Sequence, residues 1–339
     1  MTAPVPPARP DPPARPIVAV LCADRRPPGM REVERGADVR YTTADRLAGD
    51  LRGADALLVW DFRSSALEAA WPAADALRWT HVASAGVDAV LFPALRDSDV
   101  VLTNSRGVFE GPVAEYVLGL VLAFAKDLAG TMAAQRERRW WYREAERVDG
   151  ATAVIVGTGP IGRAVARTLR AVGMRVEGVG RGGRGHDPDF GVVHGLDALT
   201  RRLGHADYVV VAAPLTARTT GLVDAAALAA MKPSARLINV GRGALVVTAD
   251  LVAALRAGII AGAALDVFDT EPLPAGSPLW SMPNVLVSPH MAGDVVGHLP
   301  MLAALFVDNY GRWRRGLPLR NVVDKYLGYV PVPAAATRD

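Results

Sequence analysis

The feature that most constrains the fold of this chain is a glycine motif near its middle. An apolar run, residues 153–156, precedes the sequence Gly157-Thr158-Gly159-Pro160-Ile161-Gly162, and residues 163–169 continue with helical apolar spacing. In a strand–turn–helix unit the first glycine allows a tight turn, the second lets the backbone approach a pyrophosphate, and the third lets helix and strand pack closely. The motif predicts a dinucleotide-binding turn, although a glycine-rich turn without a ligand would carry the same glycines.

The composition indicates a globular protein of two domains. A chain of 339 residues is long for one compact core, and 50% of its residues are hydrophobic. The net charge is only +3, and the arginines of residues 136–147 are interleaved with glutamates, as on a solvated helix face. Without a basic run, we expect no nucleic-acid partner.

Three further features bear on location. Cys22 is the single cysteine, so we expect neither an intrachain disulfide nor a cysteine-based metal site, and no metal is predicted. Residues 1–16 lack the apolar core of a signal peptide and are predicted to be a disordered tail. The apolar stretch 113–125 contains Glu115 and is too short to span a bilayer. A cytoplasmic protein without a membrane partner is expected.

Short apolar runs alternate with alanine- and leucine-rich segments along the chain. We expect strands at residues 17–21, 38–41, 56–60, 79–82, 100–103, 153–156, 175–179, 208–211, 236–240, 261–265 and 285–287. Helices are expected at residues 64–77, 113–128, 131–146 and 300–315, among others. This alternation predicts an α/β fold with two doubly wound parallel sheets of the Rossmann or flavodoxin-like kind.

The end of the strand at residues 175–179 bears on the choice of nucleotide. A carboxylate normally stands there and binds both ribose hydroxyls, but this strand leads into Gly180, Arg181 and, after two more glycines, Arg184. Glu177 lies too early to take that role. Because arginine forms bidentate bonds to phosphate, the pattern favours NADP(H). NAD is the alternative if the two arginines are solvated loop residues.

The chemistry of hydride transfer needs a group that exchanges the hydroxyl proton. Six histidines compete for this role: His81, His186, His194, His205, His290 and His298. We expect His186 and His194 in a glycine-rich segment far from any strand end. His290 follows the strand 285–287 and so lies at a carboxyl-terminal strand end, where open α/β sheets bind ligands. A lone histidine is more often structural, but its position makes His290 the best candidate.

A cation and a carboxylate complete the candidate set. Arg242 lies between two glycines just past the strand 236–240, with room to meet an anionic ligand. Glu271 follows the strand 261–265 and is the candidate partner of His290. Spacing along the chain does not show whether the two side chains touch.

At these stretches the chain resembles the D-isomer-specific 2-hydroxyacid dehydrogenase family. The family patterns N-x-x-R-G, D-V-F-x-x-E-P and P-H occur here at residues 239–243, 266–272 and 289–290, after the glycine motif. Upstream, residues 86–88 and 104–115 also resemble family signatures. The resemblance covers nearly everything after the N-terminal tail.

The resemblance implies roles for individual residues. Arg242 would bind the carboxylate and carbonyl of a 2-oxo acid, His290 would donate the proton, and Glu271 would hold His290 in its protonated form. Asp266 would bind the nicotinamide carboxamide. Backbone amides of Ala85, Gly86 and Val87 would bind the substrate carboxylate. The expected cofactor-binding residues are Gly157, Thr158, Gly159, Pro160, Ile161, Gly162, Arg181, Arg184, Ala213, Pro214, Thr219, Val240, Gly241, Arg242, Asp266, His290 and Gly293.

The resemblance also implies a domain plan. A cofactor domain, residues 109–289, would be inserted in a substrate domain made of residues 17–108 and 290–339, with the catalytic cleft between them. The two long apolar helices would cross between the domains, and a homodimer would form through the cofactor domain.

The replacement of the family's nucleotide-selecting aspartate by Gly180 and Arg181 resembles the NADP-using glyoxylate and hydroxypyruvate reductases. A reductase of such small 2-oxo acids is therefore the first hypothesis. A non-enzymatic, dinucleotide-sensing corepressor is the second, because those relatives keep the Arg/Glu/His set, and a formate dehydrogenase is the third.

Overall fold

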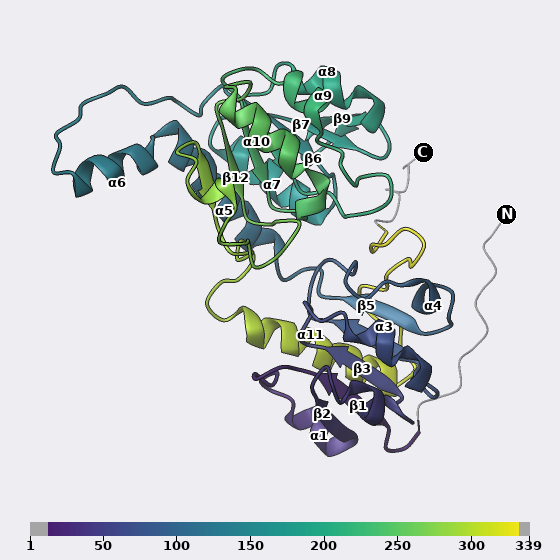
Figure 1. Cartoon of the computed structure of the whole chain (residues 1–339). Helices are drawn as coiled ribbons and strands as arrows, with labels where there is room; N and C mark the ends of the chain where they lie inside the picture. Colours follow the sequence, from purple (N-terminus) through teal and green to yellow (C-terminus); the bar gives the residue numbers. More distant parts are fainter. Residues whose placement is uncertain (1–12, 332–339) are drawn as a thin grey trace. The chain divides into compact units, whose positions relative to one another are not determined.

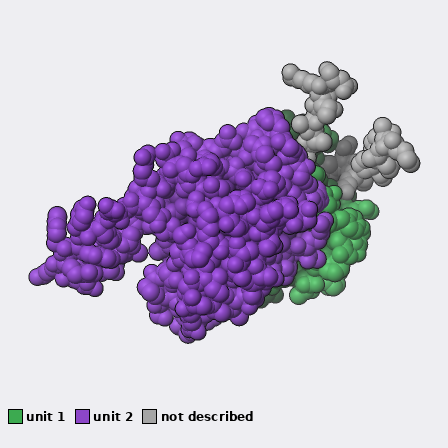
Figure 2. Space-filling view, turned by 90° about the horizontal axis from the view of Figure 1, so that it is seen from above, with its two compact units in different colours: residues 1–108, 297–339 green, residues 109–296 purple. Residues whose placement is uncertain are grey.

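The computed structural model describes residues 13–331, which form two compact units (Figures 1 and 2). Unit 1 combines the chain up to Val108 with the chain from Gly297 onward, and unit 2 is Phe109–Val296. The expected N-terminal tail lies outside the described residues as far as residue 12, and residues 13–16 form neither helix nor strand.

Unit 1 is built on a five-stranded parallel sheet. Its strands are β1 (Ile17–Leu21), β2 (Asp38–Thr42), β3 (Ala56–Val59), β4 (Trp79–Val82) and β5 (Val101–Asn104). Its helices are α1 (Arg31–Gly36), α2 (Leu47–Leu51), α3 (Ala66–Ala70), the 3-10 turn η1 (Trp71–Ala73), α4 (Pro93–Arg96) and α11 (His298–Arg314). The strand order β2-β1-β3-β4-β5 is that of a flavodoxin-like doubly wound sheet.

The central strands of this sheet, β1, β3 and β4, are buried on both faces, whereas the edge strand β2 is mostly partly exposed. Every residue of β3 is buried, and Leu57 and Val59 belong to the cluster on one face. On β4, the Trp79 ring stacks on Phe306 of α11 at a centroid distance of 5.2 Å. The C-terminal helix thus packs on the sheet formed by the first hundred residues.

Unit 2 contains an eight-stranded sheet. Its strands are β6 (Thr152–Val156), β7 (Arg175–Gly180), β8 (Arg184–Asp187), β9 (Gly191–Gly195), β10 (Tyr208–Val211), β11 (Arg236–Asn239), β12 (Gly262–Leu265) and β13 (Val285–Val287). Its helices are α5 (Glu110–Ala125), α6 (Leu128–Arg136), α7 (Pro160–Ala171), α8 (Leu199–Leu203), α9 (Ala225–Ala229) and α10 (Thr248–Arg256), with 3-10 turns η2 (Leu196–Ala198), η3 (Gly243–Leu245) and η4 (Pro278–Trp280).

The strand order of unit 2 is β13-β12-β11-β10-β6-β7-β9-β8. The chain leaves β6 toward β7 on one side and later returns to β10 on the other, so β6 lies at the topological switch point. The α/β prediction with two doubly wound sheets is confirmed, and each expected strand is present within one residue at either end. One feature differs, because β8 pairs antiparallel with β9.

The two faces of the unit 2 sheet have separate apolar cores. Val154 and Val156 of β6 face one core with α9 and α10, whereas Ala153 and Ile155 face the other with α5 and α7. Alternate residues therefore enter opposite cores, as the pleat of a strand requires. This explains why α5 is apolar, since it packs against α7 within unit 2.

The prediction of a helix at residues 131–146 is wrong. Helix α6 ends at Arg136, and residues 137–151 have neither helix nor strand, so the interleaved charges of residues 136–147 do not form a helix face. Arg138 adopts a φ of 53°, which ends the helical path. The segment extends away from the rest of unit 2 (Figure 1).

No single helix of residues 13–331 is long and apolar enough to cross a membrane. The pair α5 and α6 reaches that length and composition together but is bent by 62° at its break.

Candidate functional site

The glycine motif forms the turn between β6 and α7, at the switch point of the unit 2 sheet. Gly157 has a φ of 115°, in the region that favours glycine, and a Cβ there would lie 2.6 Å from the backbone of Ala212 and Ala213. A Cβ on Gly162 would lie 1.9 Å from the Gly157 carbonyl oxygen. Both positions therefore admit no side chain.

Gly159 differs from its neighbours, because a Cβ there would meet no atom within 4 Å. The fold itself does not need glycine at this position. An approaching ligand would explain it, since α7 begins at Pro160 and presents its first N–H groups here. The steric roles predicted for Gly157 and Gly162 are therefore confirmed, and the pyrophosphate contact at Gly159 stays a prediction.

The end of β7 lies beside this turn. A Cβ on Gly180 would lie 2.6 Å from the Thr158 hydroxyl, and one on Gly178 would lie 2.9 Å from the Phe190 ring. Glycine at the end of β7 therefore allows close packing against the glycine turn. Arg181 follows directly and is exposed.

The glycine-rich segment after β7 forms a β-hairpin, β8–β9, which we did not predict. It places Arg184 and His186 on β8 and His194 on β9, where His194 Nε2 lies 3.3 Å from Glu177. Arg184 lies 3.3 Å from the Asp187 carboxylate. Short glycine-rich strands give little periodic signal, so the sequence does not reveal this hairpin.

Arg242 lies in the turn between β11 and η3. The Asn239 side chain braces this turn, because its Nδ2 donates to the Arg242 carbonyl at 2.9 Å and its Oδ1 accepts from the Gly241 N–H at 3.1 Å. A Cβ on Gly243 would lie 1.9 Å from the Phe268 carbonyl carbon, so the turn is packed against the segment after β12. Arg242 is half-buried and its Nη1 donates to the Gly241 carbonyl at 2.9 Å.

Asp266, the residue after β12, organises the segment that carries His290. Asp266 is 1% exposed, and its carboxylate accepts bonds from Ser288 Oγ at 2.7 Å, the Met291 N–H at 3.0 Å and the Ala292 N–H at 2.9 Å. Its carbonyl also accepts from the His290 N–H at 2.8 Å. The nicotinamide contact that we expected for Asp266 stays a prediction, and the function of Ser288 was missed because a serine before a proline carries no motif.

These bonds keep the segment 290–296 in unit 2, whereas we expected the substrate domain to resume at residue 290. They also join three neighbouring strand ends. The Asp266 N–H donates to the Asn239 carbonyl at 3.1 Å, and His290 donates to Asp266 in turn. The segments of Arg242, Asp266 and His290 therefore follow one another along the carboxyl edge of the sheet.

His290 and Glu271 are in direct contact. The distance from His290 Nδ1 to Glu271 Oε2 is 2.7 Å, and the two side chains are 29% and 28% exposed. Glu271 Oε1 accepts from the Phe268 N–H at 3.0 Å, which fixes the carboxylate. His290 has a φ of 53°, in a region that non-glycine residues rarely adopt and that is often found at functional sites.

The surroundings of His81 exclude it as a candidate for the group that exchanges the hydroxyl proton. His81 is fully buried on β4, with Nδ1 2.8 Å from Thr103 Oγ1 and Nε2 3.3 Å from Ser105 Oγ. Burial lowers the pKa of His81 to about 3, so its ring stays neutral near pH 7. It is a packed core residue of unit 1.

The remaining predicted residues lie on turns beside these strand ends. After β10, Ala213 is buried, Pro214 is exposed, and Thr219 Oγ1 donates to the Pro214 carbonyl at 2.7 Å, which closes the turn. Val240 and Gly241 follow β11, and a Cβ on Gly293 would lie 2.7 Å from the Phe109 ring.

The predicted substrate loop belongs to unit 1. Asn104 Nδ2 donates to the Ala85 carbonyl and Ser84 Oγ donates to the Gly86 carbonyl, both at 2.6 Å. Both bonds are accepted by carbonyl groups of the loop 85–87, so neither uses the backbone N–H groups that are predicted to bind the substrate carboxylate. Asn104 was not predicted for this role; its place at the end of β5, beside β4, and the family signature that begins with it are the signals that could have found it.

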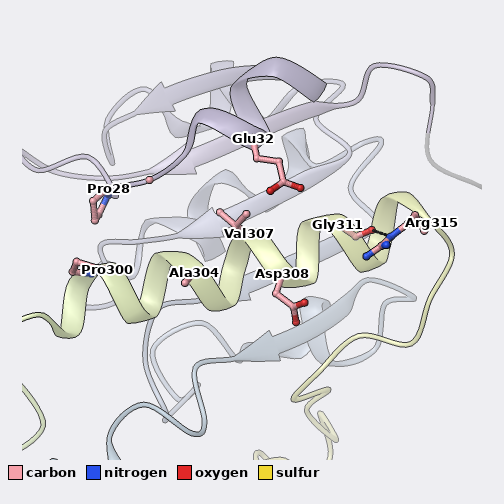
Figure 3. Close-up of a pocket in the computed structure, with 9 residues that line it drawn as sticks. Pro28, Glu32, Pro300, Ala304, Val307, Asp308, Gly311 and Arg315 are labelled. Carbon is pink, nitrogen blue, oxygen red and sulfur yellow. Dashed lines mark hydrogen bonds between the residues drawn. The ribbon is translucent and has the colours of Figure 1, made fainter.

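Two other features of the described residues do not form part of this site. A groove of about 460 Å³ lies in unit 1 along α11 (Figure 3), lined by residues that include Glu32, Val307, Asp308 and Arg315, and it contains none of the predicted site residues. Within residues 13–331, no three His, Cys, Asp or Glu side chains are grouped to hold a metal ion.

The chain resembles known proteins over most of its length. The family model "D-isomer specific 2-hydroxyacid dehydrogenase, NAD binding domain" matches residues 118–292. Glyoxylate/hydroxypyruvate reductase A of Klebsiella pneumoniae (strain 342) is 32% identical over 311 residues, which cover 88% of this chain and 95% of that protein.

Solved structures agree with this match. A D-isomer specific 2-hydroxyacid dehydrogenase from Xanthobacter autotrophicus, in complex with NADPH and MES, has a TM-score of 0.78 and 35% identity, covering 93% of this chain and 100% of its own. An NADPH-dependent glyoxylate/hydroxypyruvate reductase from Sinorhizobium meliloti, in complex with NADP and sulfate, has a TM-score of 0.78 and 30% identity over the same shares. The chain belongs to the D-isomer specific 2-hydroxyacid dehydrogenase family.

Proposed function

We propose that this protein is an NADPH-dependent reductase of small 2-oxo acids, with glyoxylate and hydroxypyruvate as first candidates. The observation that carries the proposal is the His290–Glu271 pair, 2.7 Å apart on the same sheet edge as Arg242. A proton donor beside a guanidinium matches the reduction of a keto acid, which takes up a proton and carries a negative charge. Two of the relatives described above support the choice of substrate, because they are named glyoxylate/hydroxypyruvate reductases, and one of them is described as NADPH-dependent.

The glycine turn fits the pyrophosphate of a dinucleotide. Its open side at Gly159 and the first N–H groups of α7 offer both space and donors to an anion. Arg181 and Arg184, which stand where a ribose-binding carboxylate is usual, fit a 2′-phosphate. When bound, NADPH supplies a hydride to the carbonyl carbon of the substrate.

Side chains of unit 2 would donate the proton and bind the substrate. His290 would donate a proton from Nε2 to the substrate carbonyl oxygen, because Glu271 holds Nδ1 and so fixes the direction of the ring. Arg242 would bind the carboxylate and the carbonyl oxygen by charge-assisted bonds. The loop Ala85–Val87 of unit 1 remains the predicted second contact for the carboxylate.

The activity is tested by mixing the purified protein with NADPH and a panel of 2-oxo acids and following nicotinamide absorbance. We expect turnover with glyoxylate or hydroxypyruvate and weaker use of NADH. Absence of turnover with either cofactor across the panel would contradict the proposal. Tight dinucleotide binding with a changed oligomeric state and no turnover would favour the corepressor hypothesis instead.

The proton donor is tested with His290→Ala. We expect kcat to fall by about 10²–10⁴-fold, the usual contribution of a general acid, while NADPH binding persists because the glycine turn is unchanged. Glu271→Gln should lower kcat by a smaller factor, since the ring keeps a hydrogen-bond partner. His205→Ala, in an exposed turn of the same unit, is the matched control. Unchanged turnover of His290→Ala would move the proton-donor role elsewhere.

The glycine turn is tested with a pair of alanine substitutions. Gly159→Ala adds a methyl group that meets no protein atom, so we expect unchanged thermal stability but at least about tenfold weaker NADPH binding, a loss of about 1.4 kcal/mol. Gly162→Ala places a Cβ against the Gly157 carbonyl, so we expect a loss of about 1–3 kcal/mol of folding stability. Thermal unfolding and titration calorimetry separate the two effects. Equal NADPH affinity in Gly159→Ala and wild type would contradict the assigned pyrophosphate site.

We also propose a homodimer formed through unit 2, by an arm made of α6 and residues 137–147. Figure 2 shows this projection of unit 2 from above. The arm carries exposed apolar side chains, with Trp140 99%, Tyr142 85% and Met132 53% exposed. Arg143 ties the arm back to the start of α6, since its Nε and Nη2 donate to Asp127 at 2.6 and 2.7 Å. An ordered apolar projection is typical of an interface.

The dimer is tested with Trp140→Ser. Loss of a tryptophan anchor costs about 2 kcal/mol or more at an interface, so the dimer dissociation constant should rise about 30-fold or more. Light scattering after size exclusion at several concentrations measures the shift. Tyr326→Ser is the control, because Tyr326 is 79% exposed but lies in unit 1. A monomeric wild-type protein, or an unchanged dimer in Trp140→Ser, would contradict this interface.

A cytoplasmic location belongs to the same proposal. It rests on the use of NADPH and on Cys22, which is a free, buried thiol.

A further inference from the structure

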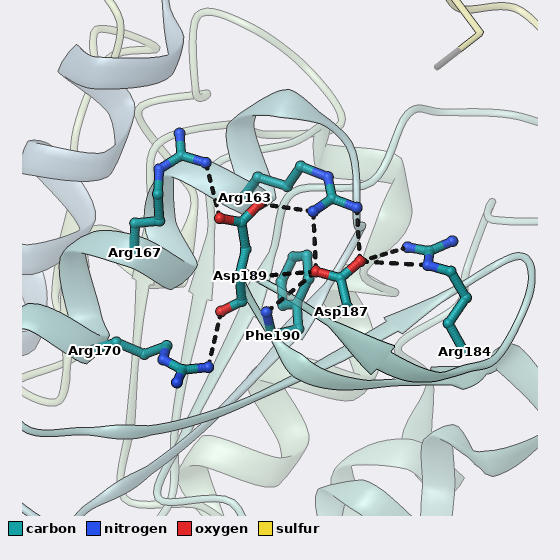
Figure 4. Close-up of polar contacts among 7 residues, drawn as sticks. All are labelled: Arg163, Arg167, Arg170, Arg184, Asp187, Asp189 and Phe190. Carbon is teal, nitrogen blue, oxygen red and sulfur yellow. Dashed lines mark hydrogen bonds and ion pairs between the residues drawn. The ribbon is translucent and has the colours of Figure 1, made fainter. Parts of the chain in front are cut away.

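The Asp187 carboxylate, at the end of β8, joins the hairpin to the helix of the glycine turn. Its Oδ1 accepts bonds from Arg163 Nη1 at 3.0 Å and from the N–H groups of Asp189 at 3.0 Å and Phe190 at 3.3 Å. Its Oδ2 accepts from Arg163 Nη2 at 2.8 Å and from Arg184 Nε and Nη2, both at 3.3 Å (Figure 4). One carboxylate therefore holds two guanidinium groups.

The first guanidinium anchors the carboxylate to the cofactor turn. Arg163 directly follows Gly162 on α7, and its Nη1 also donates to Asp189 Oδ2 at 2.7 Å. Its guanidinium lies 5.6 Å from the centre of the Phe190 ring, which is itself buried. The hairpin is thereby fixed to the first turn of α7, where the glycine motif ends.

The second guanidinium is held in one orientation by the same carboxylate. Arg184 uses Nε and Nη2 toward Asp187, and neither contact involves Nη1. Its side chain remains 45% exposed, so part of it can be reached from solvent by a phosphate. An unrestrained arginine loses side-chain entropy on binding, and a preoriented arginine loses less of it.

Asp187 keeps its charge under working conditions. Burial would raise the pKa of its carboxyl group, but hydrogen bonds from Arg163 and from the Asp189 and Phe190 amides lower the pKa to about 2. The neighbouring charges are Asp189, which binds Arg163 and Arg167, and Arg170, which donates to the Asp189 carbonyl. The arginines of this cluster outnumber its two carboxylates, so the negative charge of a bound phosphate would offset their excess positive charge.

We propose that Asp187 is a positioning residue for cofactor choice, which orients Arg184 toward the 2′-phosphate of NADPH and couples it to the glycine turn through Arg163. This inference rests on the proposed function, which assigns Arg184 to that phosphate. A carboxylate beside a phosphate-binding arginine would repel the phosphate. The orienting role of Asp187 explains why a carboxylate nevertheless stands at this position.

The test compares Asp187→Asn with Asp189→Asn. Asp189 binds Arg163 but none of its hydrogen bonds reaches Arg184, so it is a matched control within the same cluster. Titration calorimetry gives dissociation constants for NADPH, for NADH and for adenosine 2′,5′-bisphosphate, all without turnover. We expect Asp187→Asn to weaken the two 2′-phosphate ligands by about 5- to 30-fold, from about 1–2 kcal/mol of lost preorganisation, and to leave NADH within about twofold.

A double-mutant cycle with Arg184→Gln identifies the route of the effect. The double variant Asp187→Asn/Arg184→Gln should bind NADPH no more weakly than Arg184→Gln alone. Asp187→Glu, which keeps the charge but shifts the carboxylate, should show an intermediate loss and replaces Asp187→Asn if that variant does not fold.

The outcomes that overturn the inference are distinct from failure of the proposed function. Equal losses for NADPH and NADH in Asp187→Asn would show a merely structural role. A selective loss in Arg184→Gln with none in Asp187→Asn would overturn the inference alone. If Arg184→Gln itself leaves NADPH affinity unchanged, the assignment of Arg184 fails and the inference fails with it.

Discussion

The carboxyl edge of the unit 2 sheet depends on one buried carboxylate, that of Asp266. The residue is 1% exposed and its carboxylate would be costly to bury without partners, yet three donors from Ser288, Met291 and Ala292 satisfy it. The same residue bonds to Asn239 on one side and to the His290 amide on the other. The positions of His290, the proposed proton donor, and of the Arg242 turn are therefore set by hydrogen bonds that must form once the carboxylate is buried.

A parallel sheet allows this arrangement, because the carboxyl ends of its strands lie at one edge. The strands β11, β12 and β13 run in the same direction, so the segments that follow them meet at one edge even though many residues separate them in sequence. The apolar cores on both faces hold the strands rigidly, and the polar residues gather where the strands end. The glycine turn uses the same edge at the switch point, where neighbouring connections diverge.

Much of this could be predicted because the signals are local. Continuous apolar runs predicted each strand of both sheets except β8 and β9, and the glycine pattern predicted the turn with the steric roles of Gly157 and Gly162. The contact between His290 and Glu271 was predicted from the family resemblance of their motifs, because spacing along the chain does not show that two side chains touch. The hairpin was missed because glycine and charged residues dominate it, and α6 was extended too far because interleaved Arg and Glu residues suit a helix and an exposed arm equally.

The sequence by itself determined the order of strands and helices, the conformation of the glycine turn and the identity of the groups able to do chemistry, because these depend on neighbouring residues. Only the tertiary structure decided which of those groups meet. It brought Glu271 to His290, buried His81 away from any such role and joined Arg184 to Arg163 through Asp187. Such contacts depend on the packing of distant segments, and a buried carboxylate finds its partners only after the chain has closed around it.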